Sequence, residues 1–95
     1  MNDVNNIVTS IKALDQRMSV SAHNVANVNS TGYKARRAIQ SEGPSVRVTM
    51  TNAGTDLVNE ALIQNRIVID YKAALSALRT YKEMQKDTLD ELSGS

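Results

Sequence analysis

Apolar residues recur at alternating intervals of three and four along the first part of this chain. These positions are Val4, Ile7, Ile11, Leu14, Met18, Val25 and Val28, with Ser21 as one polar interruption. Such spacing puts side chains on one face of an α-helix and is typical of a helix that pairs with another helix. We therefore predict a helix over about residues 3–28, roughly 40 Å long at 1.5 Å per residue.

A second long segment without Gly or Pro covers about residues 55–92 and predicts a second helix. Its heptad positions are Leu57, Ala61, Gln64, Val68, Tyr71, Leu75, Leu78, Lys82, Gln85, Leu89 and Leu92. Thr55 or Asp56 can cap its start, because a side-chain oxygen accepts from the free backbone N–H groups there. More apolar residues lie outside this stripe, at Val58, Leu62, Ile63, Ile67 and Ile69. One partner helix cannot cover them all, so we expect a further surface to do so.

The segment between the helices has a different pattern. Ser45 to Thr51 alternates apolar and polar residues and predicts a short strand. Residues 35–41 could form a short helical turn, an extended arm or the partner strand of a minimal hairpin, and Glu42-Gly43-Pro44 ends that element. The predicted fold class is mainly α: two long helices in an antiparallel coiled-coil hairpin with a short β-strand or hairpin insert. We expect one domain over 1–92, with 29–54 as loop and strand and 93–95 as a flexible tail.

The composition excludes several classes of protein. The chain has 95 residues and no Cys, so neither disulfides nor a thiolate metal site can stabilise it. A net charge of +1 argues against nucleic acid as a partner. We expect no cleavable secretory signal, and nothing approaches the ~18 consecutive apolar residues of a membrane span. Taken alone, these features predict a cytoplasmic protein.

No residue pattern indicates an enzyme, and we predict no catalytic, cofactor-binding or metal-binding residues. The acidic residues Asp87, Asp90 and Glu91 lie near two lysines and indicate a solvated helix face. His23 is the only histidine, and we expect a surface residue or an inter-subunit contact rather than a metal ligand or base. The four glycines form no phosphate-binding loop.

One basic cluster stands out, formed by Lys34, Arg36 and Arg37. Two interpretations remain open. The cluster is either a solvated loop, or a contact with acidic residues of a neighbouring subunit or with a membrane surface.

The first helix is followed by a dense run of helix-stopping residues. Asn27, Asn29, Ser30, Thr31 and Gly32 all favour turns. Asn29 or Gly32 can adopt a left-handed conformation at low cost and reverse the chain there. Taken alone, this run predicts a helix C-cap followed by a loop.

The same stretch, Ser21 to Lys34, resembles the signature of the flagellar axial proteins, which form the rod and hook of the bacterial flagellum. That signature reads roughly A-N-N-[IL]-A-N-x-[ND]-T-P-G-Y-K. The matching residues are Ala22, Asn24, Ala26, Asn27, Asn29, Gly32, Tyr33 and Lys34. His23 stands where Asn is common, and Ser30-Thr31 replaces the usual Thr-Pro, which removes a rigidifying residue from the loop.

The second helix resembles the C-terminal pattern of the same family, roughly N-L-x-x-E-M, then Q-R-x-Y-x-A-N, then T-x-x-E-M. The matching residues are Leu57, Glu60, Tyr71, Ala73, Thr80, Glu83 and Met84. Val68-Ile69 replaces the customary Gln-Arg, and Ala74 replaces Asn. The β-rich middle of larger family members is missing, so the chain is most similar in length to a short proximal rod protein.

This resemblance implies a structural subunit of the flagellar basal-body rod in the periplasm, exported by the type III apparatus and self-assembling through its packed terminal helices. The implied partners are copies of itself, other rod and hook subunits and the export apparatus, without nucleic acid or membrane insertion. The alternative is a soluble coiled-coil adaptor or export accessory derived from the same family, in the cytoplasm. The motif and expected assembly residues are Ala22, Asn24, Ala26, Asn27, Gly32, Tyr33, Lys34, Leu57, Glu60, Ile67, Ile69 and Tyr71.

Overall fold

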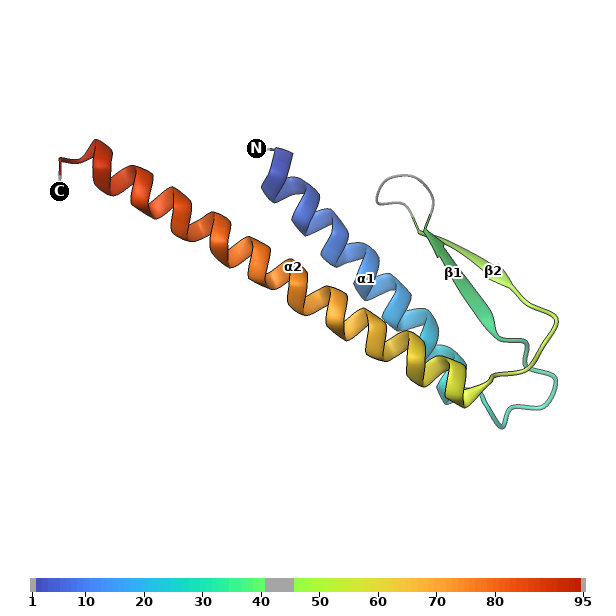
Figure 1. Ribbon diagram of the computed structural model, residues 1–95. Helices are drawn as coiled ribbons and strands as arrows, with labels where there is room; N and C mark the ends of the chain where they lie inside the picture. The colour runs from blue at the N-terminus through green and yellow to red at the C-terminus, as the bar shows by residue number, and fades with distance from the viewer. Residues whose placement is uncertain (1, 41–45, 95) are drawn as a thin grey trace.

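The chain forms two long helices that lie side by side, with a small β-hairpin against one of them (Figure 1). The computed structural model describes residues 2–40 and 46–94. The elements are α1 (Asn2–Ala26), β1 (Arg36–Gln40), β2 (Val46–Met50) and α2 (Leu57–Leu92). The molecule is elongated, with extents of 66 × 22 × 14 Å. The predicted mainly α fold class is confirmed, while the predicted break at Glu42-Gly43-Pro44 lies outside the described residues.

Helix α1 uses the predicted apolar stripe along most of its length. The inward positions of this stripe are Val4, Ile7, Ile11, Leu14, Met18 and Ser21. The last turn differs from the prediction, because Val25 is exposed while Asn24 is buried. The helix also ends at Ala26, two residues before the predicted end at Val28.

The end of α1 is fixed by polar groups of the helix-stopping run. The carbonyl oxygen of His23 accepts from the backbone N–H of Asn27 at 3.1 Å and from the Asn27 side-chain amide at 2.9 Å. Gly32 has a φ of 74°, and no described non-glycine residue has a positive φ, so Gly32 rather than Asn29 provides the left-handed turn. The chain then returns along α1.

Helix α2 presents a different face to α1 from the predicted one. The positions that are buried or half-buried are Glu60, Ile63, Gln64, Ile67, Asp70, Tyr71, Ala74, Leu78 and Tyr81. Of the predicted positions only Gln64, Tyr71 and Leu78 are half-buried. The other eight, from Leu57 to Leu92, are exposed, so most of the predicted stripe is wrong. The physical reason is the burial of Glu60. Because its carboxylate is hydrogen-bonded to α1, the face of α2 that carries Glu60 lies toward α1.

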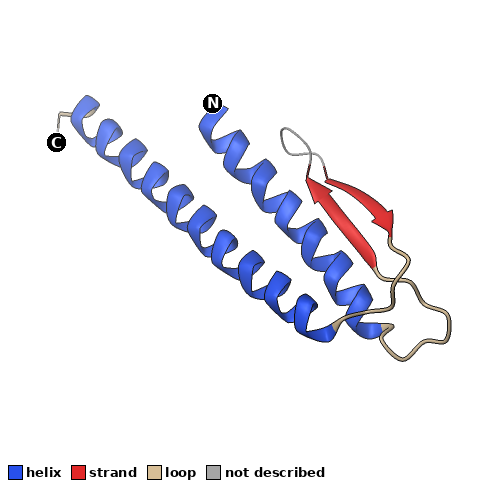
Figure 2. Cartoon of the chain, turned by 45° about the vertical axis from the view of Figure 1, so that its right-hand side comes forward, coloured by secondary structure: helices blue, strands red, loops and turns tan. Residues whose placement is uncertain are grey.

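The β-hairpin packs on α1, which lies between the hairpin and α2 (Figure 2). Strands β1 and β2 are antiparallel, with a register from Arg36↔Met50 to Gln40↔Val46. Of the open alternatives for residues 35–41, the partner strand of a minimal hairpin is the one observed. A second line of α1 residues lies toward the hairpin, and it comprises Arg17, Val20 and Asn24.

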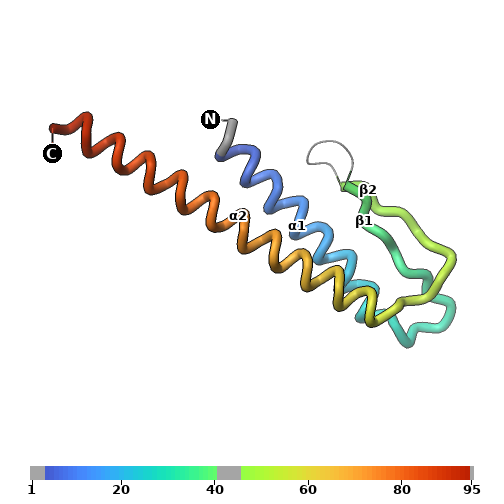
Figure 3. Tube along the Cα trace, in the orientation of Figure 1, coloured from blue at the N-terminus to red at the C-terminus, as the bar shows by residue number. Residues whose placement is uncertain are grey.

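Helix α2 is longer than its partner. It has 36 residues against 25 in α1, and its C-terminal part extends beyond the start of α1 (Figure 3). From Lys82 to Gly94 every residue is exposed. The apolar core is correspondingly thin, with Ala13, Leu14, Ala35 and Ile67 as its buried apolar residues among those described. Much apolar surface of α2 therefore stays uncovered in a single copy.

Candidate functional site: a polar cluster that joins the helices and the hairpin

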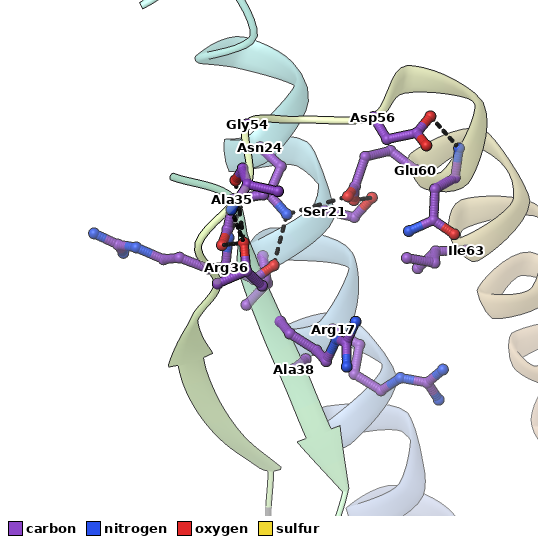
Figure 4. A pocket seen from close by; sticks show the side chains of 15 residues that line it. Arg17, Ser21, Asn24, Ala35, Arg36, Ala38, Gly54, Asp56, Glu60 and Ile63 are labelled. Carbon is purple, nitrogen blue, oxygen red and sulfur yellow. Dashed lines mark hydrogen bonds between the residues drawn. The ribbon is translucent and has the colours of Figure 1, made fainter. Parts of the chain in front are cut away.

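Asn24 is the centre of a buried polar cluster near the end of α1, and only 1% of its surface is exposed. Its Oδ1 accepts from the backbone N–H of Arg36 at 2.8 Å, and its Nδ2 donates to the Arg36 carbonyl at 2.8 Å. The side-chain amide thus pairs with the edge of β1 much as a neighbouring strand would (Figure 4). The hairpin is attached to α1 through this pair.

The remaining bonds of Asn24 reach two other parts of the chain. Oδ1 also accepts from the Tyr33 hydroxyl at 2.6 Å, and Nδ2 also donates to Glu60 Oε2 at 3.3 Å. Both amide hydrogens and both acceptor positions are therefore used, and this side chain has no capacity left for a ligand. One residue connects α1, the loop, β1 and α2.

Glu60 brings a carboxylate from α2 into the same cluster, with 4% of its surface exposed. Its Oε1 accepts from the Ser21 hydroxyl at 2.7 Å, and Gln64 Nε2 donates to Ser21 Oγ at 3.1 Å. Glu60 takes no part in the ion pair found among the described residues, which joins Arg66 and Asp70. The donors to its carboxylate, Ser21 and Asn24, are neutral. A carboxylate without such donors would be very costly to bury, and these bonds make its position tolerable.

Two neighbouring residues hold the helix ends around the cluster. The Thr55 hydroxyl donates to the backbone carbonyl of Asn24 at 2.8 Å, near the end of α1. Asp56 is the N-cap of α2, where its Oδ1 accepts from the Asn59 N–H at 3.1 Å. The capping prediction for Asp56 is confirmed, while Thr55 stabilises the other helix.

The structure brings together part of the predicted residue set. Asn24, Tyr33 and Glu60 meet in the cluster, Asn27 caps α1 and Gly32 turns the loop. Tyr71 is half-buried between the helices. The exposed members of the predicted set are Ala22, Ala26, Gly32, Lys34, Leu57 and Ile69.

Ile67 does not lie where the sequence analysis places it. We expected it among the uncovered apolar residues, but its side chain is 2% exposed and belongs to the core, so this interpretation of Ile67 is wrong. Its neighbour Ile69 is 56% exposed and remains available for contacts with another molecule. Residues two apart on a helix point about 200° away from each other, so the rotation of α2 decides which of the two is buried.

Sequence reasoning missed four members of the site: Ser21, Gln64, Thr55 and the Arg36 backbone. Ser21 and Gln64 both stand at heptad positions that normally hold apolar residues. Two polar residues on facing stripes are a signal for a buried polar contact. His23 is exposed, and its ring centroid lies 5.7 Å from that of Tyr33.

A cavity of about 250 Å³ lies beside the cluster, between α1, the hairpin and the start of α2 (Figure 4). Its apolar lining includes Val20, Ala35, Ala38 and Ile63, and three arginines also line it: Arg17, Arg36 and Arg37. We call this cavity the arginine notch. Its two carboxylates, Asp56 and Glu60, are both engaged in the hydrogen bonds described above.

Within residues 2–40 and 46–94, no three His, Cys, Asp or Glu residues come together as the ligands of a metal ion would. Neither helix combines the length and the apolar character that a membrane span requires.

Comparison with known proteins gives one family. Residues 5–34 match the family model described as flagella basal body rod protein. The matched segment contains Ser21, Asn24 and Tyr33 of the polar cluster, while Glu60 lies outside it. A comparison with curated protein sequences found no match.

Proposed function

We propose that the protein is a flagellar rod subunit that assembles through its packed helices, because residues 5–34 match the family model described as flagella basal body rod protein. That match supports a structural role in the flagellar basal body. The further steps proposed here are self-assembly, export by the type III apparatus and a place in the periplasmic part of the rod.

The observation that supports this proposal best is the use of Asn24. All hydrogen-bonding groups of this side chain, which lies in the matched segment, are used in bonds that join two helices and a hairpin. Its partners include a tyrosine and a buried carboxylate, and that carboxylate also accepts from a serine. In another setting these groups could carry chemistry. In this protein they form hydrogen bonds with one another, as buried polar groups with a structural role do.

The uncovered surface of α2 supports contacts with other subunits. Its exposed large apolar residues before the overhang are Leu57, Val58, Leu62, Val68, Ile69 and Leu75. Because α1 occupies the opposite side of α2, these residues offer a second face along the same helix. An uncovered apolar face of this kind is typical of a subunit that is completed by its neighbours.

The partners that we propose are copies of this chain, other rod and hook subunits, and the export apparatus before assembly. The alternative is a soluble coiled-coil adaptor or export accessory that shares the family's helices and stays in the cytoplasm. Both use the same apolar face, but they differ in where the protein is found.

Locating the protein tests this choice. An epitope-tagged chain should be recovered with isolated basal bodies after the outer and inner membranes are solubilised, and electron microscopy with an antibody should place the label on the rod. Recovery in the soluble cytoplasmic fraction alone, with unlabelled basal bodies, would rule out the rod and favour the adaptor. A tagged hook subunit from the same cells serves as a positive control for recovery of the axial structure.

A further inference from the structure

The C-terminal part of α2 carries a net negative charge, because its four carboxylates from Glu83 to Glu91 outnumber Lys82 and Lys86. Asp87, Asp90 and Glu91 are exposed, and the last turn of the helix contains no basic residue. The C-terminal end of a helix already has the negative pole of the helix dipole, so acidic side chains are unfavourable there. Two exposed leucines, Leu89 and Leu92, lie on the same turns. This end is therefore acidic and apolar, and α1 does not reach it.

The opposite end of the molecule has the complementary character. Three arginines, Arg17, Arg36 and Arg37, and two carboxylates, Asp56 and Glu60, line the arginine notch beside the start of α2, which leaves it one net positive charge. None of these arginines is in the ion pair found among the described residues, which joins Arg66 and Asp70. Lys34 adds a further exposed positive charge on the loop just before β1. The notch therefore suits an acidic segment that also carries apolar side chains.

The acidic end and the notch cannot meet within one copy, because the 36 residues of α2 separate them. We infer that the acidic C-terminal turns of α2 from one copy dock in the arginine notch of a second copy, with Leu89 and Leu92 against the apolar lining. The contact joins different surfaces on the two copies, so it does not close on itself and repeats along a row of subunits. This inference rests on the proposed rod function, for which it supplies a specific contact between neighbours.

A paramagnetic label can detect this contact even when it is weak. Because the chain has no Cys, Ser93→Cys gives a single site for a nitroxide at the end of α2. Labelled copies of natural isotope abundance are mixed with ¹⁵N-labelled wild-type copies, so that any broadening is between molecules. We expect selective broadening of amides in residues 35–38 and 51–54. Broadening that is absent there, or uniform over the whole chain, would overturn the inference.

Charge exchange gives a second, independent test. Variant T carries Asp90→Lys with Glu91→Lys, and variant N carries Arg17→Glu with Arg37→Glu. Each variant alone has like charges at both surfaces and should self-associate at least ~10-fold more weakly than wild type in sedimentation at low salt. Mixed in equal amounts, T and N again offer opposite charges, and association should return. Mixing that restores nothing would contradict the contact.

Controls separate this contact from misfolding and from the rod assignment. Lys72→Glu with Arg79→Glu makes the same change in charge on an exposed part of α2 away from the notch and should leave association unchanged. Because Arg17 is half-buried, Arg37→Glu alone is tested as well, and circular dichroism verifies helicity. A protein that is found in basal bodies but fails both tests keeps its rod function and loses only this contact. A protein that passes both but stays cytoplasmic keeps the contact and loses the rod assignment.

Discussion

The Ser21 hydroxyl on α1 donates to Glu60 Oε1 on α2 at 2.7 Å, with 2% and 4% of the two residues exposed. This pair joins residues 39 apart in the sequence. In a thin apolar core many helix rotations and sliding positions bury similar area, so a buried polar pair that fits in one arrangement can select it. The pair accounts for the rotation of α2 that apolar periodicity does not predict.

Removing the carboxylate tests the role of that pair. Glu60→Ala leaves the Ser21 hydroxyl and an Asn24 amide hydrogen without their partner, and we expect the free energy of unfolding to fall by about 1–3 kcal/mol. Urea denaturation followed by circular dichroism measures it. Glu83→Ala, on an exposed turn of the same helix, is the matched control and should change stability little. Equal stabilities for the two variants would mean that the cluster does not hold the helices together.

Asn24→Asp should detach the hairpin from α1. An aspartate cannot donate to the Arg36 carbonyl, and its charge would face the Glu60 carboxylate. We expect faster hydrogen exchange at the Arg36 amide and a loss of stability of about 2–3 kcal/mol. Tyr33→Phe removes one hydrogen bond to the same residue and should cost only about 1 kcal/mol. An Arg36 amide as protected in the aspartate variant as in wild type would contradict the edge pairing.

The rotation of α2 predicts opposite results for two isoleucines two residues apart. Ile67→Ala removes a buried side chain from the core and should lower the free energy of unfolding by about 2–5 kcal/mol. Ile69→Ala acts on an exposed side chain and should change it by less than about 0.5 kcal/mol. The two melting curves check this directly. If Ile69→Ala were the more destabilising of the two, the inward face of α2 would not be the one that carries Glu60 and Ile67.

The apolar face of α2 is tested by making it polar. Leu62→Ser with Ile69→Ser acts on two exposed residues, so the monomer should stay helical. Self-association or binding to other rod subunits should weaken by at least ~10-fold, because each exposed side chain loses the area it buries in the contact. Analytical ultracentrifugation measures the association. Ala73→Ser with Ala77→Ser introduces the same hydroxyls at exposed small residues of α2 as a control.

Alanine substitutions at two glycines separate the effect of a left-handed backbone conformation from the effect of the space around the added Cβ. Gly32 has a φ of 74° with open space around its missing Cβ, so Gly32→Ala should destabilise the turn by about 1 kcal/mol through conformation alone. In Gly54→Ala the added Cβ would lie 4.0 Å from the Tyr33 carbonyl oxygen, an ordinary contact, and no left-handed φ is involved. That substitution should be neutral or slightly stabilising. Thermal melts of the two variants, side by side, test the assignment of Gly32 as the turn residue.

The sequence by itself determined the two helices, a cap at Thr55 or Asp56, a turn at Asn29 or Gly32, and the apolar stripe of α1 from Val4 to Met18. These features depend on residues close together in the chain, which periodicity and turn chemistry describe well. Only the tertiary structure decided which face of α2 turns inward, how residues 36–40 pair, and that Asn24 and Glu60 are buried together. The physical reason is that α2 has apolar residues on two faces of similar strength, and hydrogen bonds between residues far apart in the sequence selected one of them.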